Sequence, residues 1–216
     1  MDNGSTDGTA EFIKKNYPKV NFYEIPNVGV DVLRNYAFSK SESEYMITLD
    51  SDAALSKDWI KKAVEYMDEH TDVGICCGKL LNDDGRIDYA GTIIAKNGGV
   101  GDIGHGKPDN PEYNTFKRIS GMTTAASIIR KKMIDEIGGF DENYYYGHED
   151  AEFGLRANIA GWKVVYNPDL IGIHSYHSSG WKKTAKGYKA KKNKFYFYDS
   201  RNSLLTILKN LEQKIY

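Results

Sequence analysis

The sequence has 216 residues, of which 40% are hydrophobic, and such a chain can bury the core of one sizeable domain. Its formal net charge of −1 gives no indication of a nucleic-acid partner. Cys76 and Cys77 are adjacent and would point to opposite faces of a strand, so no disulfide is expected between them. Together with the lack of a zinc pattern, a signal peptide or a long apolar run, this indicates a reducing, cytoplasmic setting.

The first predicted elements are a turn, a short helix and a strand. Residues 2–9 read Asp-Asn-Gly-Ser-Thr-Asp-Gly-Thr, a composition typical of a turn that caps a helix. Phe12 and Tyr17 then predict a short helix, and residues 20–25 predict a strand. The free N–H groups at the start of such a helix favour a nearby anion.

A second helix is predicted from apolar residues with helical spacing at Val32, Leu33, Tyr36 and Ala37. Arg34 lies on this helix and can reach a phosphate. It can equally form an ordinary ion pair with an acid such as Asp50. The sequence leaves both interpretations open.

The apolar run at residues 45–49 predicts a strand in which Ile47 and Leu49 are buried. Asp50 and Asp52 follow at its carboxyl end, which is the edge where ligands bind in an open α/β sheet. Two aspartates one residue apart can present hard oxygens to one divalent cation. An Asp-Ser-Asp sequence is also a common polar turn, so this stretch does not decide between the two.

Helices and strands alternate through the remainder of the chain. Residues 97–117 are rich in Gly, Pro and Asn and predict a binding loop. Glu149 and Asp150 fall at the N-terminus of a helix that ends near Gly161, where the helix dipole stabilises acids. Acids are common in first helical turns, so their position alone indicates no function.

The charge is distributed unevenly. Residues 181–216 contain ten Lys or Arg and two acidic residues, a net charge of +8, which leaves −9 for the first 180 residues. Lysines and aromatic residues are interleaved through residues 181–194, and an amphipathic helix is predicted after them. A solvated charged face and a contact with anionic lipid headgroups are the two open interpretations.

Six motifs, in order along nearly the whole chain, resemble family 2 glycosyltransferases of the rhamnosyltransferase and polysaccharide-biosynthesis type. They are the turn at residues 2–9, Asn27-Val28-Gly29 with Arg34-Asn35, Asp50-Ser51-Asp52, Gly138-Gly139-Phe140-Asp141-Glu142 with Glu149-Asp150 and Arg156, Tyr166-Asn167-Pro168-Asp169 with His174, and Arg201-Asn202. Asp50-Ser51-Asp52 is similar to the Asp-X-Asp metal motif of the family.

The resemblance implies a GT-A fold, an α/β architecture in which a mixed, mainly parallel sheet lies between helices. Residues 1–180 would form the glycosyltransferase domain, and residues 181–216 a basic aromatic segment and an amphipathic helix packed on the same domain. The family normally has a strand, a helix and a second strand before the turn at residues 2–9. The chain is therefore expected to lack that first unit, which would leave a sheet edge exposed.

The resemblance also implies inverting transfer of a hexosyl or deoxyhexosyl group from a nucleotide-diphospho-sugar, with UDP or dTDP as the nucleotide. The acceptor would be a glycan or a lipid-linked molecule. A divalent metal, Mn²⁺ or Mg²⁺, would be held by Asp52, Asp50 and His174. The residues implied in donor binding are Asp2, Asn3, Ser5, Asn27, Arg34, Asp50 and Ser51.

Asp150 is the implied general base, and Glu149 is its neighbour and acceptor-positioning group. Adjacent carboxylates raise each other's pKa, which suits a base that acts near neutral pH. Residues 181–194 are expected to contact the inner face of the membrane peripherally.

Two other classes stay open. A nucleotidyltransferase also holds a nucleotide beside paired acids, but the Gly-rich triphosphate loop typical of that class is not found. The third hypothesis is a non-catalytic or incomplete GT-A remnant that binds nucleotide weakly or needs a partner segment.

Overall fold

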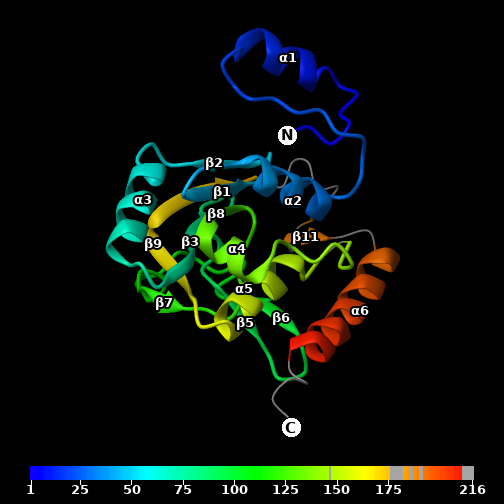
Figure 1. Ribbon diagram of the computed structural model, residues 1–216. Coiled ribbons are helices and arrows are strands. Elements are labelled where there is room, and N and C mark those ends of the chain that lie inside the picture. The colour runs from blue at the N-terminus through cyan, green and yellow to red at the C-terminus, as the bar shows by residue number, and fades with distance from the viewer. Residues whose placement is uncertain (146, 176–181, 185–186, 190–191, 211–216) are drawn as a thin grey trace.

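A computed structural model describes the chain except for residues 146, 176–181, 185–186, 190–191 and 211–216, and except for the side chains of residues 182–184, 187–189 and 192–196. Its centre is a mixed sheet with helices around it (Figure 1). The strand order is β1 (Tyr45–Leu49), β8 (Ala126–Arg130), β3 (Val73–Leu81), β9 (Lys163–His174) and β2 (Ala53–Leu55). Two shorter strands join this sheet: β4 (Ile87–Tyr89) pairs with β3, and β7 (Lys117–Arg118) pairs with β9.

The directions of the strands correct one expectation. Among the described strands β3 and β9 pair in parallel, whereas β1–β8, β3–β8 and β2–β9 are antiparallel pairs. The sheet is therefore mixed but not mainly parallel, because β8 and β2 run in the direction opposite to β1, β3 and β9. Hydrophobic patterns predict a strand but not its direction, which depends on the side from which the connecting chain returns.

The strand directions still bring two distant chain segments to one edge. Because β1 and β3 are both antiparallel to β8, they run the same way, and β9 is parallel to β3. The carboxyl ends of β1 and β9 therefore point to the same edge of the sheet, where ligands bind in open α/β sheets.

The core lies where helices pack on the sheet. Helix α3 (Trp59–Glu69) contacts β9, β3 and β8, and it inserts the fully buried side chains of Trp59, Ala63 and Met67. Helix α4 (Lys131–Ile137) packs on β8, and α5 (Glu149–Ile159) packs on β9. Cys76 and Cys77 are buried free thiols in β3, as expected from their adjacency. A fully buried side chain of the size of Met67 contributes about 1.5–3 kcal/mol.

The remaining elements lie at the periphery of the sheet. They are α2 (Val30–Lys40), the hairpin of β5 (Thr92–Ile94) and β6 (Val100–Asp102), the short 3₁₀ helix η1 (Pro111–Tyr113), the hairpin of β10 (Lys182–Thr184) and β11 (Gly187–Lys189), and the last helix, α6 (Lys192–Asn210). Helix α6 packs on α5. Within the described residues no helix is both long and apolar enough to span a bilayer.

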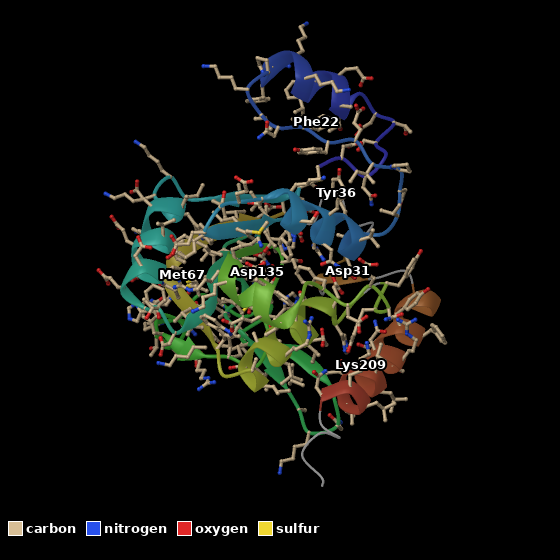
Figure 2. The ribbon with its side chains drawn as sticks, viewed as in Figure 1. Phe22, Asp31, Tyr36, Met67, Asp135 and Lys209 are labelled. Carbon is tan, nitrogen blue, oxygen red and sulfur yellow. The ribbon has the colours of Figure 1, made fainter. Side chains whose placement is uncertain are left out.

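The N-terminal segment stands away from this body (Figure 1). It contains α1 (Thr9–Asn16), in which Ala10 is the buried residue, and Figure 2 shows Phe22 well separated from Met67 in the core. The strand expected at residues 20–25 does not form, since Glu24 makes only an isolated parallel bridge to Asp2. A single bridge is too little pairing to hold a strand.

Strand β1 also differs from expectation. Ile47 and Leu49 were predicted to be buried, yet they are 37% and 48% exposed. The reason is that β1 ends the strand order and pairs with β8 alone among the described strands. These side chains line a cavity beside α2 rather than a packed core.

Candidate active site

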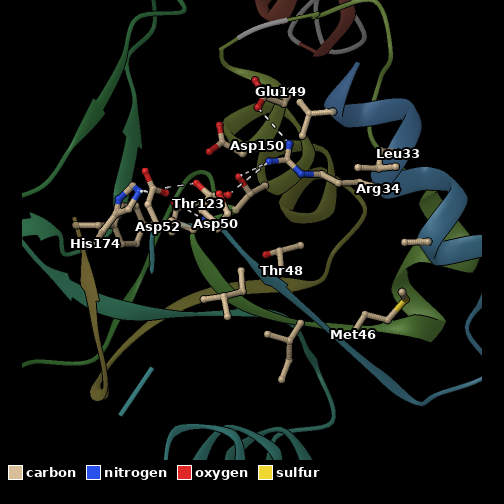
Figure 3. A pocket seen from close by; sticks show the side chains of 18 of the residues that line it. Leu33, Arg34, Met46, Thr48, Asp50, Asp52, Thr123, Glu149, Asp150 and His174 are labelled. Carbon is tan, nitrogen blue, oxygen red and sulfur yellow. Dashed lines mark hydrogen bonds and ion pairs between the residues drawn. The ribbon is translucent and has the colours of Figure 1, made fainter. Parts of the chain in front are cut away.

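The candidate site is a cavity of about 800 Å³ at the sheet edge described above (Figure 3). One wall is apolar and comes from α2 and β1, with Val30, Leu33, Ala37, Phe38, Met46, Ile47 and Leu49. The other wall is polar and mostly acidic, with Arg34, Asp50, Ser51, Asp52, Asp88, Asp102, Glu149, Asp150 and His174. One apolar wall facing a few converging polar groups is the usual construction of a small-molecule site.

The first group in the polar wall is formed by Asp50, Asp52 and His174. Asp50 follows β1, Asp52 precedes β2, and the turn between them is closed by a hydrogen bond from the Ala53 N–H to the Asp50 carbonyl at 3.0 Å. His174 pairs in register with Ala53 where β9 meets β2. Its Nε2 lies 3.3 Å from Asp52 Oδ1 and 4.0 Å from Asp50 Oδ2.

The donor atoms of these three residues fit a divalent cation. All of them lie within 4.8 Å of one another. Two carboxylates and one imidazole leave further coordination positions for the oxygens of a ligand, and the imidazole suits Mn²⁺ better than Mg²⁺. The structure therefore brings together the three residues predicted as metal ligands.

A fourth carboxylate, Asp88 in β4, was not predicted. It is buried, and its Oδ2 accepts a hydrogen bond from His174 Nδ1 at 2.9 Å. Burial alone would lower the pKa of His174, but Asp88 and the acids of the cluster outweigh burial and raise it. A carboxylate on the second ring nitrogen of a metal-binding histidine fixes the tautomer and the orientation of the ring. The sequence signal was weak, a lone aspartate within a three-residue apolar strand.

Arg34 connects the two groups of acids across the cavity (Figure 3). Its Nη1 lies 3.2 Å from Asp31 Oδ1 and 3.3 Å from Glu149 Oε1. Its Nη2 donates to Thr124 Oγ1 at 2.8 Å and lies 3.9 Å from Asp50 Oδ1. The structure thus shows the ion pairs that the sequence left open, and the guanidinium also faces the cavity.

The second group in the polar wall is Glu149 and Asp150, the first two residues of α5. The pKa of Asp150 is raised well above its usual value, first by burial and then by the charges of Glu149 and Asp102. Asp102, at the end of β6, is another carboxylate that was not predicted. A carboxylate with a raised pKa in a cleft is suited to accept a proton near neutral pH.

Acids outnumber cations in this cavity. Among its described lining residues Arg34 is the only lysine or arginine, against six acidic residues. An anionic ligand such as a diphosphate would be repelled from this wall unless a cation accompanied it. The electrostatics of the cavity therefore agree with the metal-binding geometry of its first group.

Four predicted donor-binding residues are not among those that line the cavity: Asp2, Asn3, Ser5 and Asn27. The carboxylate of Asp2 accepts hydrogen bonds from the N–H groups of Gly4 and Ser5 at 3.1 and 2.9 Å, and the Ser5 bonds are the main reason why its pKa is lowered. Asn3 Oδ1 accepts from the Val28 N–H at 3.2 Å. In this structure the side chains of Asp2 and Asn3 stabilise the N-terminal turn.

Solved structures with the same architecture show the fold. GalNAc-T7 with UDP, GalNAc and Mn²⁺ matches with a TM-score of 0.66 at 16% identity, covering 94% of this chain and 39% of that one. A mannosyltransferase from Pyrobaculum calidifontis in complex with GDP-Man and Mn²⁺ matches with a TM-score of 0.57 at 16% identity, covering 83% and 47%. Likeness at this identity shows the fold, and it confirms the predicted GT-A fold class.

Sequence comparison then gives the family. Residues 1–138 match the family described as Glycosyl transferase family 2, so the chain belongs to that family. The O-antigen biosynthesis protein RfbC of Myxococcus xanthus is 26% identical over 171 residues, 76% of this chain and 12% of that protein. An N-acetylglucosaminyl-diphospho-decaprenol L-rhamnosyltransferase of Mycobacterium tuberculosis is 24% identical over 205 residues, 83% of this chain and 66% of the relative. The chain thus spans less than two thirds of the length of either relative.

Proposed function

We propose that this chain carries the active site of an inverting glycosyltransferase that moves a hexosyl or deoxyhexosyl group from a nucleotide-diphospho-sugar to a glycan or lipid-linked acceptor. The observation that carries the proposal is that one cavity contains both the Asp50–Asp52–His174 cluster and the Glu149–Asp150 pair. Membership of glycosyl transferase family 2 supports the same reaction.

The residues have distinct roles in this proposal. Asp50, Asp52 and His174 would hold a divalent cation, Mn²⁺ or Mg²⁺, and this cation would supply positive charge to the departing diphosphate. Arg34 lies beside Asp50 and can add a second cationic contact. Ser51, in the same turn, lines the donor side of the cavity.

The reaction itself needs a single displacement. The acceptor hydroxyl oxygen bonds to the anomeric carbon while the bond from that carbon to the diphosphate oxygen breaks, and its electron pair leaves with the nucleoside diphosphate. Asp150 accepts the hydroxyl proton, and Glu149 orients the acceptor. The pKa of Asp150 is raised above its usual value, and a more basic carboxylate binds a proton more strongly, which supports this assignment.

The relatives support a narrower choice of substrate. The mycobacterial relative is described as a rhamnosyltransferase for a diphospho-decaprenol acceptor, and a Shigella flexneri relative as a dTDP-rhamnosyl transferase. We therefore place dTDP first and UDP second among the donor nucleotides, and a surface polysaccharide or its lipid-linked precursor as the product.

The test is a calorimetric titration of the chain with dTDP, UDP and GDP, each with and without Mn²⁺. We expect Mn²⁺-dependent binding of dTDP or UDP, since the acidic cavity repels an unaccompanied diphosphate. Binding that does not depend on metal would contradict the assigned role of Asp50, Asp52 and His174.

A second proposal is that the chain binds nucleotide weakly and needs a further segment. Strand β1 supports it. Ile47 and Leu49 are exposed on the strand that ends the described sheet order, and the predicted donor-binding side chains of Asp2 and Ser5 lie outside the cavity. No nucleotide binding by a folded sample, in the titration above, would favour this proposal over catalysis by the chain alone.

Contact with a membrane surface is proposed from the sequence. The lysines of residues 181–194 lie outside the described residues, apart from the backbone of β10, β11 and the start of α6. Farther along α6 the side chains of Phe197 and Leu208 are exposed. Co-sedimentation with vesicles that contain phosphatidylglycerol, but not with pure phosphatidylcholine vesicles, is the expected outcome.

A further inference from the structure

The chain just before α5 has an unusual backbone and leads directly into the proposed base. Tyr145 and His148 have φ angles of 65° and 70°, in the left-handed region that L side chains rarely adopt. His148 is the N-cap residue of α5 but makes no side-chain capping bond. Glu149 and Asp150 follow it immediately. The position of the base therefore depends on whatever holds this segment.

The segment is held by side chains of α6. Asn202 Nδ2 donates to the Gly147 carbonyl at 2.6 Å and to the Tyr144 carbonyl at 3.2 Å. Arg201 Nη2 donates to the Tyr144 carbonyl at 2.7 Å. We call these two residues, together with Tyr198, Asp199 and Thr206, the α6 clasp.

The other three members of the clasp reach the side chains of the segment. Asp199 Oδ1 lies 2.9 Å from His148 Nε2, and the ring of Tyr198 stacks on Tyr145 with centroids 5.2 Å apart. Thr206 Oγ1 and the hydroxyl of Tyr144 form a buried hydrogen bond at 3.0 Å. Side chains of α6 thus contact both left-handed residues. Strained backbone persists where the surroundings determine it this strongly.

The clasp acts on one side of the cavity. Gly147, whose carbonyl Asn202 holds, lines the cavity together with Glu149 and Asp150. Asp50, Asp52 and His174 are instead set by the pairing of β1, β2 and β9. Loss of a clasp contact should therefore displace the base while the metal cluster stays in place.

We propose that the α6 clasp sets the start of α5 and so places Glu149 and Asp150 for catalysis, with Asn202 and Asp199 as positioning residues. The catalytic part of this inference rests on the proposed function. The mechanical part, that α6 holds the left-handed segment, rests on the contacts alone. The two parts can be tested separately on the same set of variants.

Four variants separate a positioning role from a general structural one. Asn202→Ala and Asp199→Ala each remove a clasp contact, and Asp199 is partly exposed, so its replacement should leave the fold intact. Asp199→Asn keeps an oxygen that can accept from His148. Leu204→Ala is the matched control, because Leu204 is 62% exposed on the same helix.

Hydrogen exchange tests the mechanical part without any substrate. Peptides that cover residues 147–153 should exchange about tenfold faster in the two clasp variants, because Asn202→Ala loses two hydrogen bonds and Asp199→Ala loses one partly buried contact. Peptides from β3 and β9, and all peptides of Asp199→Asn and Leu204→Ala, should exchange as in the wild type. Unchanged exchange at residues 147–153, or an equal increase across the sheet, would overturn the clasp.

Kinetics test the catalytic part. In Asn202→Ala and Asp199→Ala we expect kcat to fall at least tenfold while the KM for the nucleotide sugar and the affinity for Mn²⁺ with dTDP stay within twofold. Asp199→Asn should restore most of kcat. Faster local exchange with unchanged kcat would show that α6 does not position the base. Absence of metal-dependent binding in the wild type would instead refute the proposed function and leave the exchange result to decide on the clasp.

Discussion

Asp50, Asp52 and His174 are held by pairing between strands, whereas Glu149 and Asp150 are held by the start of a helix and by side chains of another helix. In the first region main-chain hydrogen bonds fix the positions of the functional residues. In the second region a few side-chain contacts stabilise a segment whose left-handed backbone conformation is unfavourable. The comparison predicts that substitutions far from the chemistry should affect the base side more than the metal side.

The two regions also differ in how they use charge. In the metal cluster the carboxylates converge on one point, where a cation would relieve their repulsion. At Glu149 and Asp150, burial and the neighbouring acids raise the pKa of Asp150. Arg34 touches both regions, with Glu149 on one side and Asp50 on the other. It is therefore the residue through which the regions can influence each other.

The largest expected effect is that of Asp150→Asn on turnover. The amide cannot accept the proton of the acceptor hydroxyl, so the transfer rate should fall by about 10²–10⁴-fold. Affinity for dTDP with Mn²⁺ should change less than twofold, because the metal cluster is untouched. Steady-state rates and calorimetry measure the two quantities, with Asp135→Asn on the exposed face of α4 as the control. Wild-type turnover in Asp150→Asn would show that another group is the base.

Asp52→Asn tests the other region, formed by Asp50, Asp52 and His174. The substitution removes one of the two carboxylates of the cluster. We expect Mn²⁺-dependent nucleotide affinity to fall by more than about 100-fold, because losing a ligand lowers metal affinity more than losing a residue that is only hydrogen-bonded to a ligand. Hydrogen exchange at residues 147–153 should stay as in the wild type. Asp84→Asn, at an exposed turn, is the control. Retained Mn²⁺-dependent affinity would place the metal elsewhere.

A smaller loss is expected for Asp88→Asn. The amide oxygen can still accept from His174, but without the negative charge the imidazole is a weaker ligand. Such partners typically contribute about 10–100-fold to metal affinity. Titration with Mn²⁺ should therefore show an intermediate affinity, between those of the wild type and Asp52→Asn. Affinity equal to that of the wild type would mean that His174 does not bind the metal.

The structure brings together the three residues that the sequence predicted as metal ligands, and each of these residues carries a local signal. Asp50 and Asp52 end an apolar run, and the resemblance placed His174 at the end of another. Asp88 and Asp102 were missed because each is a lone acid in a three-residue strand, and only the fold shows that they reach the site. Nothing in their immediate neighbours distinguishes them from surface acids.

Burial and pairing were predicted less well than the elements themselves. Ile47 and Leu49 have the pattern of a buried strand, yet their burial depends on what lies beside β1, which the local sequence does not encode. Residues 20–25 have strand propensity but lack a partner strand in the structure. The clasp contacts of α6 join residues more than fifty positions apart, and hydrophobic periodicity carries no information about such side-chain pairs.

Asp31 tests the link that Arg34 makes between the two regions. Asp31→Asn is expected to change turnover only a few-fold. It is buried on α2 beside Arg34, and its Oδ2 has no hydrogen-bond partner among the described residues. Burial, and then the charge of Glu149, raises its pKa to about 7. In an unfolded chain the pKa of aspartate is about 3.9.

The sign of the resulting pH dependence follows from these two pKa values. Because the folded state favours the protonated carboxyl of Asp31, its contribution to stability is complete below about pH 4 and is lost as the pH rises to about 7. Asp31→Asn cannot ionise, so the variant should gain stability over the wild type across this range, by at most about 4 kcal/mol. Urea unfolding at pH 4.5, 6 and 7.5 measures the difference, with Asp84→Asn as the control. Parallel stability curves for wild type and Asp31→Asn would show that Arg34 keeps Asp31 ionised, and the charge linking the two regions would then be the ion pair itself.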